Sequence, residues 1–200
     1  MPSKENIALP IVKRVKLNNF SLYSVRRNID VTIRSGVFVL AGANGLGKST
    51  FLTALNFGLT GFVPNPNRGF QSVGEYARND FSAEFFTGRI EQQDRSIATV
   101  GLEIHLGTKI YEIGRAVFEP QELRFLRIAN TLNDSDSRDY EDYDPNERNR
   151  LYKQYIVRDM GLRSFEQFVF LQYYVLSFDE TRNLLLWESR ASAPAIDLII

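Results

Sequence analysis

The sequence contains no cysteine and a single histidine, His105. The absence of cysteine excludes disulfide bonds, thiolate metal sites and thiol catalysis, and it fits a reducing cytosol. One histidine excludes any mechanism that needs two imidazoles. The sequence also lacks a run of about 20 apolar residues, the length that crosses a membrane. Residues 1–10 have no apolar core of signal-peptide length. We therefore expect a cytoplasmic protein with no membrane partner.

Neither sign of charge dominates, because Lys plus Arg number 24 and Asp plus Glu number 24. A balanced chain has no overall attraction for nucleic acid, so any contact with DNA requires a local basic patch. Hydrophobic residues make up 44% of the 200 residues. That content and length predict a globular domain with its own core.

Alternating apolar and polar residues predict strands with one buried face near residues 15–20 and 29–33. The same alternation predicts a β-hairpin over residues 97–118, with Gly107-Thr108 as its two-residue turn. His105 falls on the polar face of this hairpin, beside Glu103, and is expected to be a surface residue. Residues 37–40 are apolar at every position, which predicts a strand buried on both faces.

Helix signals are local and capping residues define several ends. Asp144-Pro145 with Glu147 opens a helix that is expected to run to Met160 and stop at Gly161. Ser164 and Gln167 repeat the capping pattern. Further helices are predicted over residues 49–57, ending at Gly58, and after Asp179, and residues 60–82 are predicted to be largely loop.

Residues 131–149 are expected to form an acidic surface loop. Residues 133–147 carry seven carboxylates, which suits either a cation site or a solvated loop. The segment lacks the glycine and the terminal glutamate of a calcium-binding loop, which favours the solvated loop.

The motif that carries chemistry is a phosphate-binding loop. Gly42, Gly47, Lys48 and Ser49 match the pattern of glycine, four residues and then Gly-Lys-Ser/Thr. In such a loop, backbone N–H groups and the start of the next helix surround the phosphates, the lysine reaches the β- and γ-phosphates, and the hydroxyl binds Mg²⁺. We predict a site for ATP and Mg²⁺ made of Gly42, Ala43, Asn44, Gly45, Leu46, Gly47, Lys48, Ser49 and Thr50, with Ser49 as a metal ligand.

Hydrolysis also needs an acidic residue after a buried strand. The only hydrophobic run that ends in Asp-Glu is residues 175–178, before Asp179 and Glu180. Ser177 interrupts that run, and Asp179 is better placed as a helix cap. The catalytic acid is therefore expected to lie outside these 200 residues.

Three segments in order resemble the N-terminal half of the ATPase head of the SMC (structural maintenance of chromosomes) family. They look closest to the repair branch typified by the bacterial SbcC, RecF and RecN proteins. The segments are Val15–Phe20 with the strand after it, Leu40–Leu55, and Phe168–Gln172 followed by Asp179–Leu185. The resemblance implies an α/β P-loop fold with a mixed sheet, an antiparallel hairpin and flanking helices, with residues 1–200 forming half of a head.

The family resemblance also implies residue roles. Gln172 matches the Q-loop glutamine, which contacts Mg²⁺ or the attacking water, so it joins Lys48 as a catalytic candidate. Arg68 lies where such heads place an arginine that faces DNA. Ser21 stands where the repair branch often has an arginine near the nucleotide, so this sequence departs from the family pattern there.

In the family, ATP lies between two heads, and the remaining catalytic motifs belong to the C-terminal half. The implied partners are that half-head, a second head in a homodimer, DNA, and a nuclease or other accessory subunit. Location on the nucleoid follows if the source is bacterial. Residues 188–200 show no heptad run for the family's coiled coil, and these 200 residues alone should bind ATP weakly and hydrolyse little.

Two alternatives remain beside an ATPase that acts on DNA in repair, chromosome organisation or defence against foreign DNA. One is a scaffold whose assembly is gated by nucleotide, with incidental hydrolysis. The other is a small-molecule kinase or a GTPase, which use the same loop. The chain has no Asn-Lys-x-Asp element to read guanine, which disfavours a GTPase.

Overall fold

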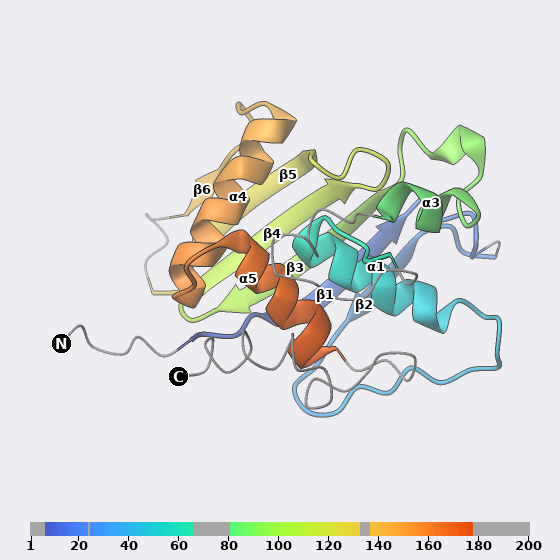
Figure 1. The fold of residues 1–200 in the computed structure, drawn as a ribbon, viewed down its shortest axis with the longest axis horizontal. Coiled ribbons are helices and arrows are strands. Elements are labelled where there is room, and N and C mark those ends of the chain that lie inside the picture. The colour runs from blue at the N-terminus through green and yellow to red at the C-terminus, as the bar shows by residue number, and fades with distance from the viewer. Residues whose placement is uncertain (1–6, 24, 66–80, 133–136, 178–200) are drawn as a thin grey trace.

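A computed structural model describes residues 7–23, 25–65, 81–132 and 137–177 (Figure 1). Six strands form one antiparallel sheet in the order β2-β1-β3-β4-β5-β6. The strands are β1 (Ile11–Asn18), β2 (Ile29–Thr32), β3 (Thr99–Leu106), β4 (Lys109–Ala116), β5 (Leu123–Asn130) and β6 (Arg138–Asp139). The helices are α1 (Lys48–Thr60), α3 (Ser82–Thr87), the short 3-10 helix η1 (Gln92–Asp94), α4 (Pro145–Met160), α5 (Phe165–Phe170) and the π-helical turn η3 (Leu171–Leu176).

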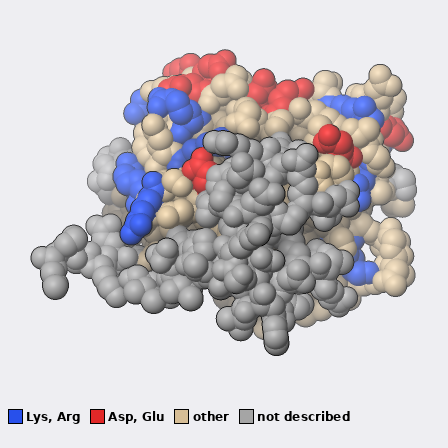
Figure 2. Space-filling view, viewed as in Figure 1, with Lys and Arg blue, Asp and Glu red and all other residues tan. Residues whose placement is uncertain are grey.

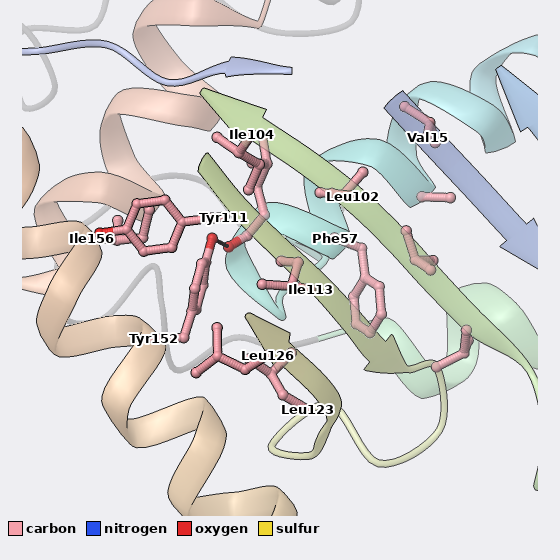
Figure 3. Close-up of a cluster of buried hydrophobic side chains, with 14 of the residues drawn as sticks. Val15, Phe57, Leu102, Ile104, Tyr111, Ile113, Leu123, Leu126, Tyr152 and Ile156 are labelled. Atoms are coloured by element: carbon pink, nitrogen blue, oxygen red, sulfur yellow. Dashed lines mark hydrogen bonds between the residues drawn. The ribbon is translucent and has the colours of Figure 1, made fainter. Parts of the chain in front are cut away.

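Helices α1, α4 and α5 cover one face of the sheet (Figure 1). Strand β3 shows why, since its buried and partly exposed residues alternate along its whole length. Its buried side chains include Leu102 and Ile104, which lie in one cluster with Phe57 of α1 and Ile156 of α4 (Figure 3). The core therefore holds α1 and α4 against the same sheet. Over the described ranges, no helix has the length and apolar character needed to cross a membrane.

Most of the predicted elements are confirmed. The hairpin joins β3 to β4 through Gly107-Thr108, with Leu106 opposite Lys109. The Asp144 side chain accepts a hydrogen bond from the N–H of Asn146 at the start of α4, and Gly161 caps its end. Ser164 caps α5 in the same way. The α/β class with flanking helices is confirmed, although every pairing among the described strands is antiparallel.

The buried strand predicted at residues 37–40 is wrong for this structure. These residues form no strand, and Val37 and Val39 are 94% and 76% exposed. A strand buried on both faces lies within a sheet that is covered on both sides, and no described strand pairs with this segment. Leu52 of α1 is also exposed.

Two further differences concern helix and loop boundaries. Helix α1 does not end at Gly58, which is buried within it, but at Gly61. Within residues 131–149 the structure places β6 and the beginning of α4, and Tyr140 is buried.

Strand β5 had no sequence prediction, because Arg124, Arg127 and the surrounding apolar residues do not alternate strictly. The helix predicted after Asp179 lies outside the described residues.

The C-terminal end of α1 is held by a buried cation. Arg115 of β4 is fully buried and donates from Nε to the carbonyl of Gly58 at 3.1 Å. Its Nη1 donates to the carbonyl of Pro120 at 2.7 Å and to Oδ1 of Asn149 at 2.9 Å. Burial lowers the pKa of Arg115 to about 10, so the group stays charged at neutral pH. The last carbonyls of a helix carry partial negative charge, which suits a cation at this place.

Gly61 is expected to resist substitution because of this arrangement. Its φ is +70°, and a Cβ there would lie 2.7 Å from Nη1 of Arg115. Gly61→Ala should lower the free energy of unfolding by at least about 1–2 kcal/mol, the cost of the left-handed conformation alone. Urea denaturation measures this change. Gly88→Ala is the control, since Gly88 ends α3 with φ −81° and open space around it. Equal effects of the two substitutions would contradict the explanation.

Candidate functional site

The phosphate loop leads directly into the N-terminal end of α1. Gly45 and Gly47 have φ values of +84° and +82°, and Gly47 is the N-cap of α1 in a left-handed conformation. Among the residues that the structure describes, no side chain caps this end, and the first turn contains no acidic residue. The first N–H groups of the helix therefore remain available as donors, and the positive end of the helix dipole lies at the loop. This geometry favours binding of an anion.

The charged and polar groups of the motif gather at the same end. The ammonium of Lys48 donates to the carbonyls of Gly42 and Ala43 at 2.6 and 2.7 Å, so it lies over the loop. Ser49 is exposed in the first turn of α1, where its hydroxyl is open to a metal-bound phosphate. Thr50 is buried, and its hydroxyl accepts from Nε of Arg89 at 3.3 Å. Thr50 thus anchors the first turn of α1, whereas Lys48 and Ser49 face outward. Ala43, Asn44 and Leu46 are exposed parts of the loop.

Tyr23 is a site residue that the sequence did not reveal. It lies between β1 and β2, and its hydroxyl donates to the carbonyl of Gly47 at 2.8 Å. A Cβ at position 47 would lie 2.8 Å from Cε1 of Tyr23, so the ring packs directly on this glycine. Burial raises the pKa of Tyr23 and keeps its hydroxyl a neutral donor. No sequence motif links Tyr23 to Gly47, and their contact can be recognised only in the folded chain.

Gln172 reaches the phosphate-loop helix, but at its middle. Its Nε2 donates to Oδ1 of Asn56 at 2.9 Å, and Nδ2 of Asn56 donates to Oγ of Ser177 at 3.1 Å. Asn56 lies on the same face of α1 as Ser49, two turns later, about 10 Å along the axis. The structure therefore places Gln172 against the same face of α1 as Ser49, with its amide bonded to Asn56, and its role as a Q-loop residue stays a prediction.

Other candidates are not brought to this site. Arg68, Asp179 and Glu180 lie outside the described residues. His105 contacts Oε1 of Glu103 at 3.0 Å on the side of the sheet away from the helices, as expected for a surface pair. In the described ranges, no group of three or more His, Cys, Asp or Glu side chains could hold a metal ion.

Comparison with known families identifies the kind of domain to which the chain belongs. A family model described as an AAA domain matches residues 14–190, which is most of the chain. The chain belongs to the AAA domain family. This family is found in the ATPase heads of SMC-like and SbcC-like ABC proteins, which confirms the resemblance stated from the sequence. No curated protein gave a significant match. The AAA domain is thus an ATPase-type P-loop domain.

The contact between Tyr23 and Gly47 predicts a measurable effect on nucleotide binding. Tyr23→Phe keeps the ring but removes a hydrogen bond of about 0.5–1.5 kcal/mol. If that bond holds the loop in its binding conformation, the Kd for ATP should rise about 2- to 10-fold. Titration of a fluorescent ATP analogue gives this value. Tyr143→Phe, far along the chain on the β6 side, is the control and should leave the Kd unchanged; an unchanged Kd for Tyr23→Phe would refute the role.

Proposed function

We propose that this AAA domain binds ATP with Mg²⁺ at residues 42–50 and hydrolyses it as part of a head that acts on DNA. The observation that carries the nucleotide site is the uncapped N-terminal end of α1 beside Lys48 and the exposed Ser49. Backbone donors, one cation and one hydroxyl are the groups that hold nucleotide phosphates and their metal in P-loop proteins. Mg²⁺, when bound, neutralises charge on the β- and γ-phosphate oxygens.

The surface beside the loop supports a head that is completed by further polypeptide. Residues 37–40 are apolar and exposed, and Leu46, Leu52 and Leu176 are also exposed. Single exposed apolar residues are ordinary, but a fully apolar extended run is typical of a strand with neighbours on both sides. We propose that the C-terminal half of the head supplies those neighbours together with the catalytic acid.

A second head in a homodimer, DNA, and a nuclease or other accessory subunit are proposed partners that rest on the family resemblance. Repair, chromosome organisation and defence against foreign DNA are all compatible with such a head. Assembly gated by nucleotide, with incidental hydrolysis, is the second candidate function. The exposed apolar run favours it equally, because both functions need a partner surface near the nucleotide.

The nucleotide site is tested by Lys48→Ala and Ser49→Ala. Lys48→Ala should weaken ATP binding at least about tenfold, since a charge-assisted contact contributes about 1.5–3 kcal/mol. Ser49→Ala should remove the difference in affinity measured with Mg²⁺ and with EDTA. Calorimetric titration with a non-hydrolysable ATP analogue measures both effects.

Lys16→Ala is the matched control, because Lys16 is an exposed lysine on β1. It should leave binding unchanged. ATP affinity in Lys48→Ala equal to that of the Lys16→Ala control would sink the proposed site.

The catalytic and DNA roles are tested in the complete head. Gln172→Ala should lower ATP hydrolysis while ATP binding is retained, because the amide is proposed to act on the metal or the water. Arg68→Glu should abolish stimulation of hydrolysis by duplex DNA without changing the basal rate. Steady-state ATPase rates with and without DNA measure both. A normal rate in Gln172→Ala, or unchanged DNA binding and stimulation in Arg68→Glu, would each reject the corresponding role.

A further inference from the structure

A second basic site lies at the edge of the sheet opposite to β2. Strand β6 is that edge, and α4 packs on β5 beside it (Figure 1). A pocket of about 310 Å³ opens there between the strands and α4. Three of its lining side chains are the cations Lys109, Arg138 and Arg158, and two are Tyr140 and Tyr155. In the space-filling view, basic side chains lie over α4 and on its β6 side, with acidic side chains beside and above them (Figure 2).

Arg138 is held in place by tyrosines rather than by a carboxylate. Its guanidinium lies 5.1 Å from the ring centroid of Tyr140 and 5.7 Å from that of Tyr143. Its Nη2 donates to the hydroxyl of Tyr143 at 2.8 Å. Within the described residues, Nε and Nη1 have no hydrogen-bond partner and the group makes no ion pair. Stacking on aromatic rings orders an arginine while leaving its donors free for a ligand.

Arg158 is ordered in a similar way. Its guanidinium lies 4.7 Å from the ring centroid of Tyr155, and its Nε donates to Oδ1 of Asp159 at 2.7 Å. Its two Nη groups make no hydrogen bond to the parts of the chain that the structure describes. Two arginine forks with free donors therefore line one pocket.

Asp159 accounts for one of the three positive charges. Its carboxylate accepts from Nζ of Lys109 at 2.9 and 3.1 Å and from the hydroxyl of Tyr111. These bonds fasten α4 to β4, which is a structural role. Asp159 thus pairs with Lys109 and, through one bond, with Arg158, whereas Arg138 has no anionic partner among the described residues. Counting Asp159 and the three cations among the described residues, the pocket has two positive charges in excess.

We propose that this pocket binds a phosphate monoester or inorganic phosphate, separately from the nucleotide phosphates at residues 42–50. A phosphate monoester carries about −1.5 to −2 charges near pH 7, which matches the charge that remains. Its three oxygens accept from two guanidinium forks, the geometry that makes arginine a phosphate-binding residue. The group is either a free phosphate or small phosphate ester, or the terminal phosphate of a nucleic acid strand.

The site is tested with inorganic phosphate as the probe, in the Lys48→Ala chain so that the phosphate loop does not contribute. Titration at constant ionic strength, followed by NMR of the arginine Nε–H and tyrosine ring signals, should give saturable shifts in the pocket. Arg138→Gln and Arg158→Gln should each raise the Kd at least about fivefold, which corresponds to losing one hydrogen bond of about 1 kcal/mol.

Arg163→Gln is the matched control, since Arg163 is exposed just after α4 and its side chain has no partner among the described residues. It should leave the Kd unchanged. Unsaturable shifts, or equal loss in Arg163→Gln, would overturn the proposal. Variants with an unchanged unfolding midpoint are the ones compared. ATP binding by the chain with Lys48 intact should not depend on Arg138, so failure of this site and failure of the nucleotide site are distinguishable.

Three probes distinguish a free phosphate ester from the terminal phosphate of a nucleic acid strand. They are adenosine monophosphate and one short DNA strand with and without a 5′-phosphate. Tighter binding of the phosphorylated strand than of either other probe assigns the pocket to strand ends. Equal binding of adenosine monophosphate and the phosphorylated strand assigns it to free phosphate esters. Equal binding of the strand with and without its 5′-phosphate, together with no effect of Arg138→Gln, rejects a phosphate monoester site.

Discussion

Hydrogen bonds from the buried Arg115 join the sheet, α1 and α4 at one place in the core. Arg115 comes from β4 and reaches Gly58 of α1, Pro120 before β5 and Asn149 of α4. Tyr152 adds a bond from its hydroxyl to the carbonyl of Leu59 at 2.7 Å. Hydrogen bonds from the sheet and from α4 therefore hold the same end of α1. Nη2 of Arg115 finds no partner in the described residues, so this cation stays buried without full compensation.

Because these hydrogen bonds hold the C-terminal end of the rigid helix α1, its N-terminal end also has a defined position. The N-terminal end carries uncapped N–H groups, and Tyr23 bonds the carbonyl of the N-cap Gly47. Asn56, in between, bonds Gln172. One helix thus connects the core, the phosphate loop and the segment that contains the Q-loop candidate.

The two edges of the sheet differ in what they leave exposed. After β2 the chain exposes the apolar run at residues 37–40, and at the β6 edge it exposes arginines ordered on tyrosines. An exposed apolar surface is typical of a site that packs against another polypeptide, whereas ordered arginines suit an anion. The contrast separates a surface proposed to complete the head from a surface proposed to bind phosphate.

Elements that depend on neighbouring residues could be predicted from the sequence alone. The Asp144 and Ser164 caps and the β3–β4 hairpin were predictable, because capping and turn chemistry act over a few residues. The loop at residues 42–49 was named from its motif in the same way, and its role in binding phosphate stays a prediction. Tertiary structure alone decided which distant groups meet, such as Tyr23 with Gly47, Gln172 with Asn56, and Arg115 with the end of α1. It also decided that residues 37–40 are exposed, since an apolar run becomes a buried strand only when other strands pair with it. Local patterns state what a segment can form, and only packing decides what it contacts.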